Sequence, residues 1–153
     1  MNKFLRLFVC VIVLLASACQ SLQTATAPES KPKQALVDGV TLNYLDEGQG
    51  VPVVFVHGAF SDRRNWEAQR AAVSKQYRYI ALDQRYFGAA PWSDGGSRYS
   101  VATHANDLAV FIEQLNAGPV NVVGWSYGGA VAVKSGPTSP RTMQILGRVA
   151  AHH

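Results

Sequence analysis

The chain has 153 residues, of which 48% are hydrophobic and 16% charged, as is typical of one globular domain and not of a disordered polypeptide. Its formal net charge is only +4, and no basic stripe with interleaved aromatic residues is present, so nucleic-acid binding is not expected. The two cysteines, Cys10 and Cys19, both lie near the N-terminus, which excludes an intrachain disulfide or a cysteine-rich metal site from residue 20 onward.

The first 18 residues have the pattern of an export signal. Lys3 and Arg6 precede an almost wholly apolar run from residue 7 to residue 18. This run is shorter than the roughly 20 residues that span a bilayer, and small residues stand at its end. We therefore predict a signal peptide over residues 1–18, followed by export to the cell envelope or secretion.

Three outcomes of processing fit this segment. Residues 16–18, Ala-Ser-Ala, fit an ordinary cleavage site. Alternatively, the segment stays uncleaved and acts as an anchor. Residues 15–19, Leu-Ala-Ser-Ala-Cys, resemble a bacterial lipobox, in which Cys19 becomes the lipid-modified first residue. We favour the lipoprotein, since Cys19 falls at the cleavage point, and expect a membrane anchor on the periplasmic side or at the outer membrane. Residues 19–34 are polar without periodicity and are predicted to be a flexible tether.

From residue 35 the sequence indicates a β-sheet. Residues 35–37 and 40–45 are predicted to form two strands joined by a tight Asp38-Gly39 turn. Three continuous apolar runs follow, and each is typical of a strand covered on both faces, as in a parallel sheet. These runs are residues 51–56, 77–82 and 120–123.

Helical patterns lie between the predicted strands. They cover residues 65–74, 100–115 and 127–135, and Ser100 is a candidate N-cap. Strands that alternate with helices predict an α/β fold over residues 35–135, with about five strands, mostly parallel, and helices on both faces.

The strongest chemical signal is the segment Gly124-Trp125-Ser126-Tyr127-Gly128, called the elbow below. It fits the pattern G-x-S-x-G between an apolar strand and a helix rich in small residues. Such a sharp turn needs glycine on both sides, lifts the serine hydroxyl above the sheet, and sets it beside a helix N-terminus and the Tyr127 N–H. A nucleotide-binding turn would show a P-loop lysine or a G-x-G-x-x-G run, and neither is present. We predict that Ser126 is a nucleophile.

His57-Gly58-Ala59-Phe60 directly follows the strand at residues 51–56. Together with the elbow, it resembles the α/β-hydrolase fold family, in its esterase, haloperoxidase-like and C–C hydrolase branch. The resemblance covers roughly residues 36–135, the N-terminal half of that fold. It implies that His57 and Gly58 shape the oxyanion loop, and that the N–H of Phe60 joins that of Tyr127 in holding an oxyanion. His57 is expected to stabilise the loop and not to act as the general base.

A second loop resembles the family's D-x-R-x-x-G turn. It runs from Asp83 to Gly88, with Tyr86 where the family usually has glycine. Asp83 and Arg85 are expected to brace this loop. His104 lies in a helical pattern and is expected to be a surface or half-buried residue.

The resemblance implies a serine hydrolase that attacks an ester-like carbonyl of a small molecule and uses no metal or cofactor. A serine nucleophile argues against dehalogenases and soluble epoxide hydrolases, which use an aspartate at the elbow. Four aromatic residues favour an apolar, aromatic pocket, namely Phe60, Trp92, Trp125 and Tyr127.

The order of the family's triad is Ser, then Asp or Glu, then His. After Ser126 the sequence contains no acidic residue, and its only histidines are His152 and His153. We therefore expect the C-terminal strands to be missing, the strand at residues 120–123 to be an exposed edge, and residues 136–153 to be an atypical tail. The 153-residue chain is expected to be weakly active or inactive. The alternative is a non-catalytic exported fragment or binding lipoprotein that keeps the half-fold.

Overall fold

The computed structural model describes residues 30–136 and 143–145. The predicted signal peptide, Cys19 and most of the predicted tether therefore lie outside the described residues. In the described part, no helix is both long and apolar enough to cross a membrane.

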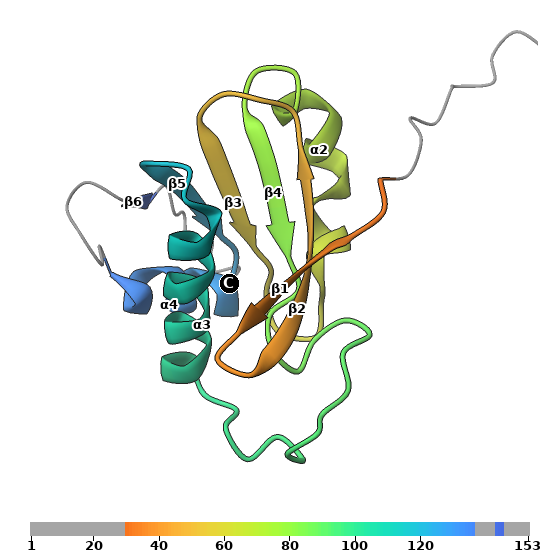
Figure 1. The fold of residues 1–153 in the computed structure, drawn as a ribbon, viewed down its shortest axis with the longest axis vertical. Helices are drawn as coiled ribbons and strands as arrows, with labels where there is room; N and C mark the ends of the chain where they lie inside the picture. The colour runs from red at the N-terminus through yellow and green to blue at the C-terminus, as the bar shows by residue number, and fades with distance from the viewer. Residues whose placement is uncertain (1–29, 137–142, 146–153) are drawn as a thin grey trace, which may run out of the picture.

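A six-stranded sheet forms the centre of the molecule, with the strand order β1-β2-β4-β3-β5-β6 (Figure 1). The strands are β1 (Lys33–Val37), β2 (Val40–Glu47), β3 (Pro52–Val56), β4 (Arg78–Leu82), β5 (Val120–Gly124) and β6 (Met143–Ile145). The helices are the 3₁₀ turn η2 (Arg63–Trp66), α2 (Glu67–Val73), α3 (Val101–Leu115) and α4 (Tyr127–Ser135).

The predicted α/β fold with a mostly parallel sheet is confirmed. β3 pairs in parallel with both β4 and β5, and β5 pairs in parallel with β6. β1 and β2 form the expected antiparallel hairpin, whose turn residues Asp38 and Gly39 both have positive φ angles, 45° and 78°. Such angles are those of a type I′ turn, which joins two adjacent antiparallel strands closely.

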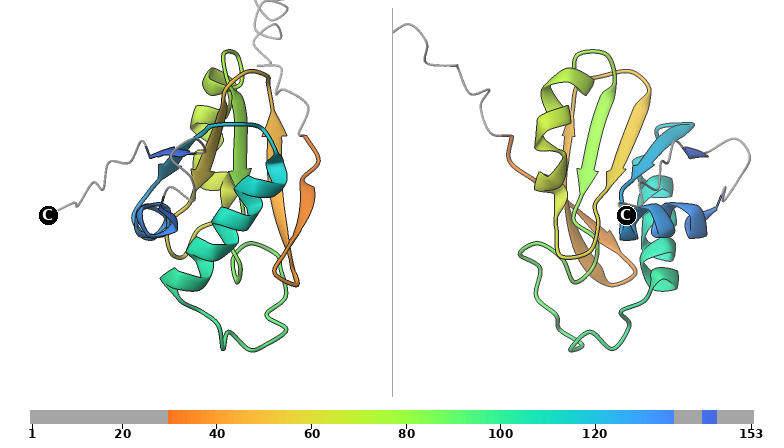
Figure 2. Two further views of the ribbon diagram at one scale, coloured as in Figure 1. Left: turned by 60° about the vertical axis from the view of Figure 1, so that its left-hand side comes forward. Right: turned by 180° about the vertical axis from the view of Figure 1, so that it is seen from behind.

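Helices cover both faces of the sheet (Figure 2). On one face, α3 and α4 pack over a core that includes Val54, Ile80 and Leu108. On the other face, η2 and α2 cover a smaller cluster centred on Phe55, whose ring lies 5.0 Å from those of Trp66 and Tyr79. Every residue of β3 is buried, which explains why its sequence is a continuous apolar run.

The expectation that residues 120–123 form an exposed edge was wrong. β6 pairs with β5 from Val120 to Val122 and takes the edge position in the described sheet. Sequence patterns missed β6 because it has only three residues and follows Gly-Pro and Ser-Pro steps. Of the tail predicted as atypical, the structure describes only Gly136 and this strand.

Helix α3 begins as its sequence predicts. The Ser100 hydroxyl accepts a 3.0 Å hydrogen bond from the backbone N–H of Thr103, the contact expected of an N-cap. His104, Asp107, Leu108 and Phe111 are buried on the side of the helix that faces the rest of the fold. A buried Asp107 among these residues needs a partner, because an isolated carboxylate is costly to bury.

That partner is Arg85, in the loop after β4. Its guanidinium donates two 2.7 Å hydrogen bonds to the Asp107 carboxylate, and both side chains are about 2% exposed. The paired geometry holds the β4–α3 loop against α3. A third charge, the Asp38 carboxylate at the tip of the β1–β2 hairpin, lies 3.8 Å from Arg85.

We predict that Asp107→Ala lowers the free energy of unfolding of the full chain by about 3–5 kcal/mol, since it removes both hydrogen bonds of the buried Arg85 and leaves only the more distant Asp38 carboxylate near its charge. Glu67→Ala is the matched control. It breaks an ion pair to Arg70 whose acidic side chain is 59% exposed, and should change stability by less than about 1 kcal/mol. Urea unfolding of both variants measures the difference, and equal small losses would contradict this account.

Candidate active site

Ser126 is placed at a strained turn between β5 and α4. Its backbone has φ 52° and ψ −120°, in the positive-φ range that side chains rarely adopt. Ser126 is an exposed residue. The structure therefore presents the hydroxyl at the surface, above the carboxyl end of a parallel strand.

Close backbone contacts hold this turn in place. A β-carbon at Gly124 would lie 2.5 Å from the carbonyl oxygen of Gly128, and one at Gly128 would lie 2.3 Å from that of Val56. Both positions therefore require glycine, as the elbow pattern predicts. The N–H of Trp125 donates to the same Val56 carbonyl at 3.1 Å. The elbow thus rests directly on the end of β3.

Helix α4 starts immediately after Ser126. Gly129 N–H donates to the Ser126 carbonyl at 2.9 Å, and Gly128 N–H donates to that of Trp125 at 2.9 Å. Among the described residues, the Tyr127 N–H donates to no backbone carbonyl. An N–H at a helix N-terminus carries partial positive charge and can bind a developing anion.

The segment after β3 lies against the elbow. A β-carbon at Gly58 would lie 2.7 Å from the Trp125 ring and 3.3 Å from the Ser126 β-carbon. Two residues later, Phe60 has φ 57° and a fully exposed ring. The structure therefore brings together the two segments that the sequence analysis assigned to an oxyanion hole.

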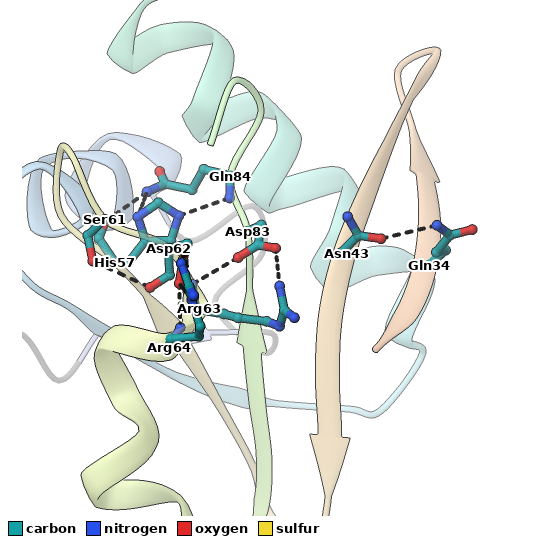
Figure 3. Close-up of polar contacts among 9 residues, drawn as sticks. All are labelled: Gln34, Asn43, His57, Ser61, Asp62, Arg63, Arg64, Asp83 and Gln84. Atoms are coloured by element: carbon teal, nitrogen blue, oxygen red, sulfur yellow. Dashed lines mark hydrogen bonds and ion pairs between the residues drawn. The ribbon is translucent and has the colours of Figure 1, made fainter. Parts of the chain in front are cut away.

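His57 is completely buried, and both ring nitrogens are engaged. Figure 3 shows its contacts with Gln84. Nδ1 lies 2.8 Å from the Gly58 carbonyl oxygen, and Nε2 accepts a 3.1 Å hydrogen bond from the backbone N–H of Gln84. The Gln84 side chain donates in return to the His57 carbonyl at 2.8 Å. Burial lowers the pKa of His57, so the ring is neutral near pH 7. It links the loops after β3 and β4.

Asp83 makes a second link between these loops. Its carboxylate accepts a 2.9 Å hydrogen bond from the Arg63 N–H and forms an ion pair with the Arg63 guanidinium (Figure 3). Gly88 closes the loop beside the same carboxylate, where a β-carbon would lie 2.7 Å from Oδ2. With Arg85 bound to Asp107, both charged residues of the D-x-R-x-x-G turn form ion pairs within the protein.

Tyr86 takes the backbone conformation that glycine would usually supply. Its φ is 68°, and its hydroxyl donates to Asp94 at 2.5 Å. The departure from the family pattern therefore keeps the left-handed turn. The position strains a tyrosine, and ring packing against Trp92 and Tyr99 compensates.

The expectation for His104 was wrong. It is 2% exposed, because α3 packs against α4 and a group of aromatic rings encloses the imidazole. Its Nδ1 lies 2.6 Å from the Tyr127 hydroxyl. Burial lowers its pKa.

A cleft of about 1010 Å³ opens between the loops after β3 and β4, and no residue of the elbow lines it. Its walls include the aromatic residues Phe60, Tyr86, Phe87, Trp92 and Tyr99, and its polar lining includes Ser61, Asp62, Arg63 and Arg64. Phe60 and Trp92 line it as expected, whereas Trp125 and Tyr127 do not. The ring of Phe87 connects the cleft to the elbow, at 6.2 Å from the Tyr127 ring.

Sequence reasoning missed three partners that build the site, namely Arg63, Gln84 and Asp107. Asp107 carried a signal, because it lies three residues after His104 and four before Phe111, on one helix face. The other two lie in loops, where no periodicity indicates a contact. Among the described residues, no group of three or more His, Cys, Asp or Glu side chains is arranged to hold a metal ion.

The two buried histidines predict a pH dependence of stability. In the unfolded chain each ring titrates near 6.5, whereas in the folded chain it stays neutral to lower pH. The unfolded state therefore binds more protons below pH 6.5, and the free energy of unfolding falls as the pH is lowered. The slope should reach up to about 1.4 kcal/mol per pH unit for each histidine.

Urea unfolding between about pH 7 and pH 5 measures this slope before carboxylates protonate in the unfolded chain. The variant His104→Asn should show a smaller slope than the unmodified chain. Stability that does not change with pH over this interval would contradict the prediction.

A family model described as the alpha/beta hydrolase fold matches residues 51–134. The chain is 42% identical over 94 residues to the non-heme chloroperoxidase CPO-A1 of Kitasatospora aureofaciens, covering 60% of this chain and 33% of that protein. It is 31% identical over 123 residues to the 2-hydroxy-6-oxo-2,4-heptadienoate hydrolase of Pseudomonas putida, covering 76% of this chain and 44% of that protein.

Solved structures of enzymes also match the chain. An epoxide hydrolase from Vigna radiata matches with a TM-score of 0.71 and 25% identity, over 80% of this chain and 41% of that one. An N-acyl homoserine lactone degrading enzyme matches with a TM-score of 0.66 and 27% identity, over 72% of this chain and 42% of that one. The chain thus spans between a third and a half of the length of these relatives. Because the family model matches more than half of its residues, the chain belongs to the alpha/beta hydrolase fold family.

Proposed function

We propose that Ser126 is the nucleophile of a hydrolase that acts on an ester-like carbonyl of a small molecule. One observation carries the proposal: an exposed serine at φ 52°, held between two glycines at the N-terminus of α4. A serine in a conformation this strained indicates a functional constraint, because an ordinary strand-to-helix turn does not require it. Similarity to a hydrolase and a lactone-degrading enzyme supports this class of substrate.

The proposed reaction uses backbone groups to stabilise charge. The Ser126 Oγ forms a bond to the carbonyl carbon and loses its proton to a base, while the carbonyl oxygen becomes an oxyanion. The N–H groups of Tyr127 and Phe60 would stabilise this oxyanion as hydrogen-bond donors. Collapse expels the alcohol, which takes up a proton, and leaves an acyl-serine. Water then attacks the acyl-serine and releases the acid.

The lining of the aromatic cleft supports a particular kind of substrate group. The Arg64 and Arg63 guanidinium groups are already paired with Asp62 and Asp83. Each guanidinium charge is therefore balanced by a carboxylate, although Arg63 Nε has no hydrogen-bond partner among the described residues. The aromatic walls instead favour an uncharged, apolar or aromatic group.

Neither described histidine is placed to activate Ser126. Both nitrogens of His57 are engaged in the loop, and His104 is buried with its Nδ1 at the Tyr127 hydroxyl. A serine without a base stays a weak nucleophile near pH 7. The 153-residue polypeptide by itself is therefore proposed to be weakly active or inactive.

A small, reactive phosphonofluoridate tests the nucleophile. We expect slow modification of the full chain at Ser126, identified by mass spectrometry, and loss of that modification in Ser126→Ala. The matched control Ser93→Ala removes a hydroxyl from the loop after β4 and should leave the modification intact. Modification spread evenly over several serines would reject Ser126 as the nucleophile and favour a non-catalytic binding role.

Turnover gives a second measurement. Hydrolysis of p-nitrophenyl acetate by the full chain should be close to the rate of Ser126→Ala, because neither described histidine is placed to act as the base, and absence of the base removes a factor of about 10⁴ or more in a serine hydrolase. Fast, Ser126-dependent hydrolysis would show that a base lies within this chain.

We also propose that Cys19 is lipid-modified after export and anchors the chain to a membrane of the cell envelope. The support is the charged start, the short apolar run and the small residues before Cys19 in the sequence. Expression with radiolabelled palmitate in a bacterial host should label the unmodified chain and Cys10→Ser, but not Cys19→Ser. Equal labelling of both variants would contradict a lipid on Cys19, and a soluble, unlabelled exported product would favour plain secretion.

A further inference from the structure

His104 has no part in the proposed reaction, although it is buried next to the residue that follows the nucleophile. Its Nδ1 lies 2.6 Å from the Tyr127 hydroxyl, and its Nε2 has no hydrogen-bond partner within the described residues. An unpaired buried nitrogen is destabilising, and an apolar side chain of similar size would avoid it. The short contact of the polar ring is the one to the Tyr127 hydroxyl, and the backbone of Arg85 also lies close enough to act on its pKa.

Tyr127 connects this bond to the elbow. It is the first residue of α4, and its N–H is the proposed oxyanion donor. Its ring stacks on Tyr99 at 5.9 Å and 26°, and stands almost perpendicular to His104 at 5.5 Å and 78°. Burial raises the pKa of Tyr127 to about 12. The hydroxyl thus keeps its proton and can donate a hydrogen bond to the neutral imidazole.

The elbow needs support on two sides to keep Ser126 at a positive φ. On the sheet side, Gly128 lies in backbone contact with Val56 and His57. On the side of α3, the bond between Tyr127 and His104 joins the first turn of α4 to a buried position of the neighbouring helix.

We infer that His104 is a positioning residue, which acts through the Tyr127 hydroxyl to hold the start of α4 and to direct the Tyr127 N–H beside Ser126. The inference rests on the proposed function of Ser126 and Tyr127. It assigns His104 no contact with the substrate.

Three variants of the full chain separate the hydrogen bond from packing. Tyr127→Phe removes the hydroxyl and keeps the ring. His104→Leu fills much of the space without an acceptor. His104→Asn leaves a cavity but keeps a polar atom near the position of Nδ1. If the bond positions the elbow, Ser126 modification slows about fivefold in Tyr127→Phe and His104→Leu, the factor expected for one net hydrogen bond, and less in His104→Asn.

Global stability should follow the opposite order at position 104. Leucine fills a buried site better than asparagine, so His104→Leu should be the more stable of the two in urea unfolding. If His104 serves only packing, His104→Asn should be less stable than His104→Leu and should also show the slower modification of Ser126. That result would overturn the inference.

A second readout does not depend on the reactivity of Ser126. The backbone amide signals of Trp125 and Ser126 in ¹H–¹⁵N spectra should shift together in Tyr127→Phe and in His104→Leu, and the double variant should add no further shift. Tyr44→Phe is the matched control, since Tyr44 packs on α3 through Phe111 and lies outside the elbow. In the spectrum of Tyr44→Phe, the amide signals of Trp125 and Ser126 should keep their positions.

The two proposals fail in different ways. If Ser126→Ala leaves phosphonylation unchanged, the proposed function is rejected, while the amide signals still decide the role of His104. If the shifts of those amide signals are as small in Tyr127→Phe as in Tyr44→Phe, the positioning role is rejected even though Ser126 reacts.

Discussion

The structure depends on the close approach of two backbone segments, the end of β3 and the start of α4. A β-carbon at Gly128 would lie 2.3 Å from the Val56 carbonyl oxygen, so these segments meet with no side chain between them. This contact fixes Ser126 at a positive φ and leaves the first N–H of α4 beside it. The sheet supplies the rigid platform, since β3 is fully buried between β4 and β5. A strained turn persists only where its surroundings hold it this tightly.

The loops around the elbow are built by buried or partly buried polar contacts. His57 joins the loop after β3 to Gln84, Asp83 joins the same two loops through Arg63, and Arg85 fixes the second loop to α3 through Asp107. Buried ionic and polar groups of this kind are destabilising unless every partner is present. They favour one loop arrangement because any other would break a partnership in the interior. Preorganisation of this kind allows a backbone site to stabilise charge without reorganising during a reaction.

Much of this arrangement could be predicted from the sequence because it follows from short-range rules. Gly124 and Gly128 flank a serine after an apolar strand, and that spacing alone defines the turn. Ser100 marked the start of α3, and Asp38-Gly39 marked the hairpin. Contacts between segments that are distant in the sequence were harder to predict. His104 was misplaced because a polar residue on a helix gives no sign of the aromatic rings that enclose it. β6 was missed because three residues are too few to show a period. Tyr86 shows that a residue other than glycine can hold the left-handed backbone conformation of this turn.

The pairing of charges in the loops around the elbow affects which forces act at Ser126. Asp83, Arg85 and their partners neutralise one another, and the buried His57 is uncharged near pH 7. The remaining polarity comes from the fixed dipoles of α4 and its first amide. Because Ser126 is exposed, dissolved salt screens the effect of these dipoles, which falls off within the first turn of the helix. A charge that develops at the serine is therefore stabilised mainly by the amide groups that touch it, and only weakly by the rest of the helix.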